Sequence, residues 1–226
     1  MRARPADTAP SPPALFPMSE LPLPAAPRRL FTALFPDAAA CAAVDAARRR
    51  WAGLPPGRPK AGQLPRGAAD HAQRGSVGAN GLPSRLHPVP ERMHLTLQFF
   101  GQVDAPHAQA WQALLSGLRF EPFEIELDRA ELWHAPSGVI AVLRPASNPA
   151  LDALHHVTAQ LARQAGLPAA TQGFRPHLTT LRRAKATELA PLRQPIGWTV
   201  RAIDLIWSDL HAQPPRYHRL GRFPAP

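Results

Sequence analysis

The sequence predicts an α+β fold, with antiparallel β-sheet and helices on one face. Three observations predict it. Segments of strand and helix periodicity alternate as β, α, β, α, β, β, α, β, and two more strands close the chain. Some strands follow one another without a crossover helix, which suits antiparallel pairing. Each half also leads through a strand and a helix to a strand with His-Leu-Thr, at residues 94–96 and 177–179.

Two Pro-rich or Gly-rich regions lie outside this pattern. Residues 1–27 contain eight prolines and few groups that could pack, so we expect a disordered tail. Residues at about 54–90 are rich in Gly and Pro and lack apolar periodicity. A connection of that length is unusual in a compact domain, and we expect a flexible insertion. A single domain over residues 28–226 remains.

The first half is predicted from four segments. A strand covers residues 28–36, and a helix follows it over 37–53, with Asp37 as cap and basic residues in its last turns. A strand covers 93–103, where alternation predicts that Leu95, Leu97 and Phe99 face the core and that His94, Thr96 and Gln98 face the other way. An amphipathic helix capped by Asp104 then runs to about Leu118.

The second half repeats the theme with more strands. Two strands, 123–133 and 138–145, are joined by a turn at 135–138, and a helix covers 148–164 between an Asn-Pro start and a Gly stop. The second His-Leu-Thr strand covers 174–183. A weak helical pattern at 187–193 precedes two final strands, at 198–210 and 216–224.

Composition restricts the setting of the protein. Cys41 is the only cysteine, so no intramolecular disulfide forms, and we expect a reducing compartment, the cytoplasm. Prolines interrupt every apolar run near the N-terminus, which argues against a signal peptide or a membrane span. The formal charge of +10 allows nucleic-acid binding. However, 24 of the 26 basic residues are Arg, and Arg-, Ala- and Pro-rich coding bias is the favoured explanation of the excess.

The two His-Leu-Thr strands are the strongest functional signal. Ten histidines and nine threonines in 226 residues predict about 0.4 chance copies of His-x-Thr, and three occur. On a strand, residues i and i+2 share a face, so His94 lies with Thr96 and His177 with Thr179. The third copy, at 156–158, falls in a predicted helix, where i and i+2 point apart, and we treat it as coincidence.

Paired imidazoles with hydroxyl neighbours suit the chemistry of a phosphodiester. Histidine has an ordinary pKa near 6.5, so one ring can take a proton from water while the other protonates a leaving alkoxide. Threonine hydroxyls donate hydrogen bonds to anionic oxygen without adding charge. The sequence shows no zinc-ligand spacing, nucleophile elbow, P-loop or dinucleotide fingerprint. We therefore expect a mechanism with no metal and no cofactor.

Four stretches together resemble a known family. "RLFTALFPD", "PERMHLTLQFFGQV", "FRPHLTTLRRA" and "RYHRLGRF" are similar to segments of the 2H phosphoesterase superfamily, specifically bacterial RNA 2′,3′-cyclic phosphodiesterases once called 2′-5′ RNA ligases. The resemblance covers about residues 28–223 apart from the insertion. It implies a bilobal fold in which two antiparallel sheets with outer helices are related by pseudo-twofold symmetry around a central cleft.

The resemblance also implies roles for individual residues. His94 and His177 match the catalytic histidines, Thr96 and Thr179 the phosphate-binding threonines, and Arg182 a basic residue that contacts phosphate. Strict alternation would turn Arg182 away from His177, so a bulge or strand end must bring it back; Arg183 is the fallback. Analogy assigns His177 as base and His94 as acid, and the reverse stays open. Thr180 departs from the family, which has an apolar residue there.

Three functions follow from this interpretation. The resemblance implies hydrolysis of RNA 2′,3′-cyclic phosphate ends to 2′-phosphate, with RNA ends or cyclic nucleotides as substrate. The alternatives are 2′-5′ RNA ligation as a minor reverse activity and a non-catalytic RNA-binding module. We expect a monomer that does not associate with membranes. Trp133, Phe31 and Tyr217 are interpreted as packing residues rather than platforms for bases.

Overall fold

The computed structural model describes residues 26–54, 88–136, 138–169, 173–184, 187–212 and 216–226. The fold is α+β, and its strands pair antiparallel throughout these residues. The strand order across the sheet is β6-β3-β4-β5-β2-β1-β7-β8. The strands are β1 (Arg28–Leu34), β2 (Leu95–Val103), β3 (Phe123–Ala135), β4 (Gly138–Pro145), β5 (Leu178–Arg182), β6 (Ile196–Val200), β7 (Ala202–Asp209) and β8 (Arg216–Pro224).

The expectation of two separate sheets is wrong for the described residues. The eight strands form one sheet, because β2 and β5, which carry the two His-Leu-Thr segments, pair with each other at Leu95 and Leu178. Four strands lie on each side of this junction. Alternation along each strand could not reveal it, since sequence periodicity says nothing about which strand edges meet. The two motifs are thus neighbours at the centre of one sheet.

The predicted helix starts are confirmed by capping contacts. The helices are α1 (Ala38–Trp51), α2 (Ala105–Gly117) and α3 (Pro149–Gln164), with a short 3-10 turn, η1, at Pro90–Arg92. The carboxylates of Asp37 and Asp104 each accept a hydrogen bond from a backbone N–H three residues on, and so does the Asn148 side-chain oxygen. These caps satisfy amides that the first helical turn leaves unpaired.

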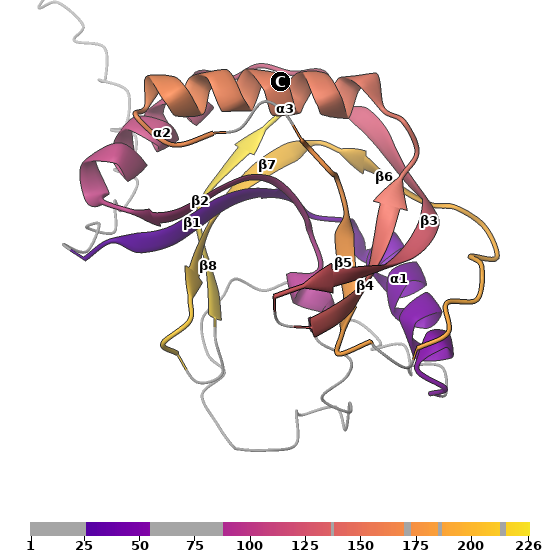
Figure 1. The fold of residues 1–226 in the computed structure, drawn as a ribbon. Helices are drawn as coiled ribbons and strands as arrows, with labels where there is room; N and C mark the ends of the chain where they lie inside the picture. The colour runs from indigo at the N-terminus through magenta and orange to yellow at the C-terminus, as the bar shows by residue number, and fades with distance from the viewer. Residues whose placement is uncertain (1–25, 55–87, 137, 170–172, 185–186, 213–215) are drawn as a thin grey trace, which may run out of the picture.

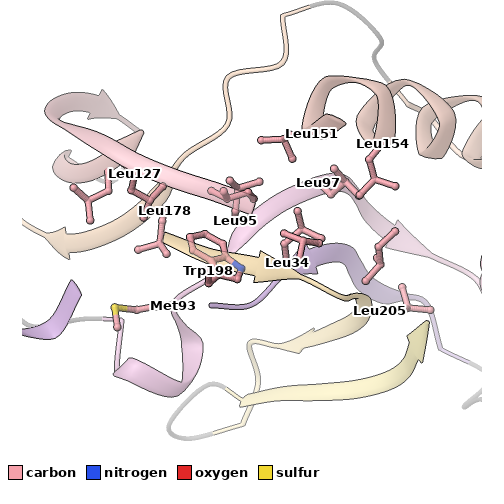
Figure 2. Close-up of a cluster of buried hydrophobic side chains, with 14 of the residues drawn as sticks. Leu34, Met93, Leu95, Leu97, Leu127, Leu151, Leu154, Leu178, Trp198 and Leu205 are labelled. Atoms are coloured by element: carbon pink, nitrogen blue, oxygen red, sulfur yellow. The ribbon is translucent and has the colours of Figure 1, made fainter. Parts of the chain in front are cut away.

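One core joins the helices to the sheet. Leu151 and Leu154 of α3 point toward Leu97 of β2, and buried leucines from both sides of the β2–β5 junction belong to the same cluster (Figure 2). In Figure 1 β1 and β2 arch beneath α2 and α3. Residues Val44 of α1 and Trp111 of α2 are fully buried in this cluster as well. The opposite face of the sheet is therefore the one available for a site.

Two β-bulges in β2 overturn part of the predicted alternation. The pairing of β1 with β2 shifts twice, which leaves Phe100 and Leu97 without a partner. Each extra residue reverses the facing of the side chains after it. Phe99 is consequently 52% exposed while Phe100 is buried. Gln98 turns to the helix side, where its amide donates to the His155 carbonyl of α3 at 2.9 Å.

The last third of the chain differs most from expectation. No helix forms over 187–193; this segment is irregular. The single strand predicted over 198–210 is two strands separated by Arg201, with β6 paired to β3 and β7 paired to β1 and β8. Arg201 alone therefore links β6, an edge strand, to β7 in the other half of the sheet. So short a link requires the sheet to curl until the two strands lie close together. The curvature is evident in Figure 1.

Some expectations lie outside the described residues. These include the predicted disordered tail, except for residues 26–27, and nearly all of the predicted insertion. Among the helices that the structure describes, none has the length and apolar character needed to cross a bilayer.

Candidate active site

The two His-Leu-Thr segments present their polar residues on one face at the centre of the sheet. Leu95 and Leu178, which pair with each other, are fully buried. Side chains alternate along a strand, and opposite residues of an antiparallel pair point to the same face. The histidine and threonine that flank each leucine are thus directed away from the core. Antiparallel order also sets each histidine toward the threonine of the other segment.

Both histidines are held by the same backbone contact. His94 Nδ1 lies 2.7 Å from the carbonyl oxygen of Arg92, and His177 Nδ1 lies 2.8 Å from that of Arg175. A carbonyl oxygen only accepts, so Nδ1 carries the proton in each ring. The Nε2 atom of each neutral ring is then left with its lone pair. Two proton-transfer atoms are therefore presented by equivalent means from β2 and β5.

The surroundings of both imidazoles favour the neutral ring in the free protein. Burial lowers the pKa of His94 from its ordinary 6.5 to about 4. The charges of His177 and Arg182 lower it further, and the hydrogen bond to Arg92 opposes the shift. Burial also lowers the pKa of His177, helped by the charges of Arg144 and Arg175. The two rings thus lie close enough to interact, in surroundings that disfavour a cation until an anion binds.

Thr96 and Thr179 lie beside the histidines with their hydroxyls available. Both residues are partly exposed. Among the residues that the structure describes, the threonine hydroxyls that donate to another group are those of Thr158, Thr180 and Thr199, not those of Thr96 or Thr179. The two O–H groups can donate to a bound anion without losing an existing contact.

A bulge directs Arg182 to the same face. The pairing of β4 with β5 shifts at Thr180, which has no partner on β4. Thr180 and Leu181 are both buried, so alternation resumes with Arg182 exposed on the histidine side. The Thr180 hydroxyl donates to the Ala141 carbonyl at 2.9 Å, which satisfies this buried polar group. Arg183, the fallback, has a φ of 57° and is exposed.

Sequence reasoning missed the aromatic residues around the histidines. The Tyr217 ring of β8 lies 5.7 Å from that of His94, and the Phe31 ring lies 4.9 Å from it. The Trp133 ring of β3 lies 4.6 Å from that of His177. Tyr217 and Trp133 are far from either histidine in sequence, and only the strand order brings them to the site. Each histidine therefore has an aromatic wall supplied by its own half of the sheet.

The sheet face that carries the two histidines combines proton-transfer groups with nearby cationic side chains. Arg182 and Arg144 act electrostatically on the histidines. Within the described residues, no three His, Cys, Asp or Glu side chains come together as metal ligands would. Neutral imidazoles, hydroxyl donors and guanidinium groups fit an anionic, phosphate-like substrate.

Such a site and fold define a phosphoesterase-type protein. The family model for the 2′-5′ RNA ligase superfamily matches residues 69–212, and the chain belongs to that superfamily. The resemblance to the 2H phosphoesterases is thereby confirmed. Membership indicates chemistry on phosphodiesters or cyclic phosphates.

Solved structures share the fold over most of their length. A protein described as a phosphoesterase is 25% identical with a TM-score of 0.63, over 88% of this chain and 98% of its own. Escherichia coli LigT in complex with 3′-AMP is 22% identical with a TM-score of 0.62, over the same shares. The protein TT0787 of Thermus thermophilus is 25% identical with a TM-score of 0.57, over 87% and 97%. No curated protein matches the chain.

Proposed function

We propose that the protein hydrolyses RNA 2′,3′-cyclic phosphate ends to 2′-phosphates, with His94 and His177 as the acid–base pair. The observation that carries the proposal is the equivalence of the two histidines. Each has Nδ1 bound to the carbonyl two residues earlier, and each directly precedes the leucine through which the two segments pair. A pair presented in this way suits a reaction in which one proton is taken up while another is delivered.

The reaction needs one bond to form and one to break at phosphorus. A neutral Nε2 takes a proton from water as the water oxygen bonds to phosphorus. The other Nε2, carrying a proton, delivers it to O3′ as the P–O3′ bond breaks, leaving the phosphate on O2′. Thr96, Thr179 and Arg182 would stabilise the charge that grows on the non-bridging oxygens. The first histidine ends protonated and the second neutral, so proton exchange with solvent must restore both rings before the next cycle.

The assignment of base and acid has support in both directions. The family resemblance assigns His177 as base and His94 as acid. However, the pKa of about 4 favours His94 as the base, because its Nε2 atom is then unprotonated at neutral pH and can accept a proton. Phosphate binding raises the pKa of both rings, since an anion favours the imidazolium.

The identity of the product tests the proposal. An RNA oligonucleotide with a 2′,3′-cyclic phosphate end, incubated with the protein and a chelator, should yield a 2′-phosphate. A 3′-phosphate product would show that the P–O2′ bond breaks instead. Activity that disappears with chelator and returns with metal would contradict catalysis by the histidines alone.

Substitution of either histidine should abolish turnover while binding persists. His94→Ala and His177→Ala each remove one proton-transfer group, and we expect kcat to fall about 10²-fold to 10⁴-fold. His156→Ala is the matched control, because it removes an exposed histidine from the helical His-x-Thr copy on α3. Near-normal turnover in either site variant would contradict the two-histidine scheme. RNA binding by a wild-type protein that hydrolyses no cyclic phosphate would instead favour the non-catalytic RNA-binding alternative.

Ligation is a second candidate because of the family to which the chain belongs. The superfamily takes its description from 2′-5′ RNA ligation. The same two proton transfers, with a 5′-hydroxyl in place of water, would join that oxygen to phosphorus as the P–O3′ bond of the 2′,3′-cyclic phosphate breaks. Structures of LigT with 3′-AMP, ATP and NADP+ also support nucleotide-like ligands for this fold. Water at bulk concentration makes hydrolysis the main direction.

A further inference from the structure

A guanidinium group lies beside each histidine in the same arrangement. Arg92 and Arg175, each two residues before a histidine, use their backbone carbonyls to hold Nδ1. Their side chains lie over the aromatic rings that flank the histidines. The Arg92 Cζ atom is 4.9 Å from the centre of the Tyr217 ring, and the Arg175 Cζ atom is 4.2 Å from that of Trp133.

The two stacked pairs hold their cations close to the histidines. The ring separations place the Arg92 Cζ atom no more than about 11 Å from the centre of the His94 ring. The corresponding bound for Arg175 and His177 is about 9 Å. Stacking on an aromatic face leaves the N–H groups at the edge of the guanidinium free to donate.

Neither cation makes an ion pair with a carboxylate in the part of the chain that the structure describes, although Glu91 lies near enough to raise the pKa of Arg92. Arg92 and Arg175 appear in none of its ion pairs and donate none of its side-chain hydrogen bonds. Burial lowers the pKa of Arg92, the more enclosed of the two. By contrast, Arg219 and Arg222 on the same half share the carboxylate of Asp204. Guanidinium groups that make no ion pair within the protein can bind an anion from outside.

We propose that these stacked arginines form outer phosphate subsites, which select substrates carrying a second phosphate next to the cyclic one. The inference rests on the proposed function. Since the leaving O3′ and the nucleoside lie beside the acidic histidine, the arginine on that side binds the phosphate attached to the 5′ oxygen. The other arginine lies on the side of the attacking water.

Three substrates separate the contribution of that phosphate from that of a longer chain. The first is a nucleoside 2′,3′-cyclic phosphate, the second is its 5′-phosphorylated form, and the third is a dinucleotide ending in a 2′,3′-cyclic phosphate. We expect kcat/KM for the second and third to exceed that for the first by about tenfold, the effect of one charge-assisted hydrogen bond. A gain for the dinucleotide alone would assign recognition to the added nucleoside and overturn the inference.

Variants locate the subsite. Arg92→Gln or Arg175→Gln, whichever lies on the nucleoside side, should reduce that tenfold preference to about unity, while Arg→Lys restores part of it. Arg163→Gln on α3 removes the same charge from the helix-covered side and should leave the preference unchanged. Preference retained in both site variants and in the double variant would overturn the inference.

The outcome distinguishes this inference from the proposed function. A wild-type protein that hydrolyses none of the three substrates contradicts the proposed function itself. One that hydrolyses all three equally well contradicts only the outer subsites. The variant that loses the preference also identifies the histidine beside the leaving oxygen. Arg92 would make His94 the acid, and Arg175 would make His177 the acid.

Discussion

At the scale of single residues, the site depends on two imidazoles kept uncharged by burial. Each ring is fixed through Nδ1 and packed against an aromatic wall, so Nε2 is the one atom of each ring left for chemistry. The surrounding arginines lower the histidine pKa values while attracting an anionic substrate. The same charges therefore keep the free site unprotonated and prepare it for phosphate.

The pH dependence of kcat/KM follows from these pKa shifts. Catalysis needs one histidine protonated and the other neutral, and kcat/KM reports the free enzyme. Because both pKa values lie below 6.5 in the free protein, the singly protonated pair is most populated below pH 6.5. We expect a bell-shaped profile with its maximum below that pH and a decline through neutrality. Initial rates at low substrate concentration measure it, and a maximum above pH 7 would contradict the shifts.

At the scale of elements, bulges decide which side chains reach the site. The extra residue in β5 brings Arg182 to the histidine face, and the bulges in β2 place Phe99 outside and Gln98 inside. Thr180 is the residue on which the β5 bulge depends, and its buried hydroxyl donates to the Ala141 carbonyl.

Replacing Thr180 by valine tests this contact. Thr180→Val keeps the shape but removes the hydroxyl, so the Ala141 carbonyl loses its donor. We expect the free energy of unfolding to fall by about 1–2 kcal/mol, as for a lost buried hydrogen bond. Urea denaturation measures the change. Unchanged or higher stability would mean that an apolar residue, which the family resemblance led us to expect here, suits the bulge better than threonine.

The elements also show which features sequence could predict. Helix caps and most strand bounds depend on neighbouring residues, so Asp37, Asp104 and Asn148 were identified correctly. The bulges, the break at Arg201 and the roles of Tyr217 and Trp133 depend on strands distant in sequence. Periodicity contains no information about those pairings, so the sequence alone predicts packing roles for both rings. The His-Leu-Thr segments were visible because strand alternation alone puts their polar residues on one face.

At the scale of the whole molecule, the two halves share one sheet and one core. The hydrophobic cluster includes residues of α1, α2 and α3 and of strands on both sides of the β2–β5 junction. A site formed at that junction is positioned by both halves, so neither half holds the complete set of histidines.

Unfolding should accordingly be a single cooperative transition. Buried tryptophans report from different places, among them Trp111 of α2 and Trp198 of β6, while far-ultraviolet circular dichroism reports the whole sheet. Because the core is shared, we expect the two signals to give the same midpoint and slope in urea. Two separated transitions would indicate halves that fold independently.

A double-mutant cycle on the histidines tests the central claim most directly. Single-turnover rate constants for a 2′,3′-cyclic phosphate substrate would be measured in the wild type, His94→Ala, His177→Ala and the double variant. If both rings act in one step on one phosphorus, each single loss should cost nearly as much as the double loss. The account would be contradicted if the fold-reductions in rate constant of the two single variants multiplied in the double variant. A single variant with a normal rate constant would also contradict it.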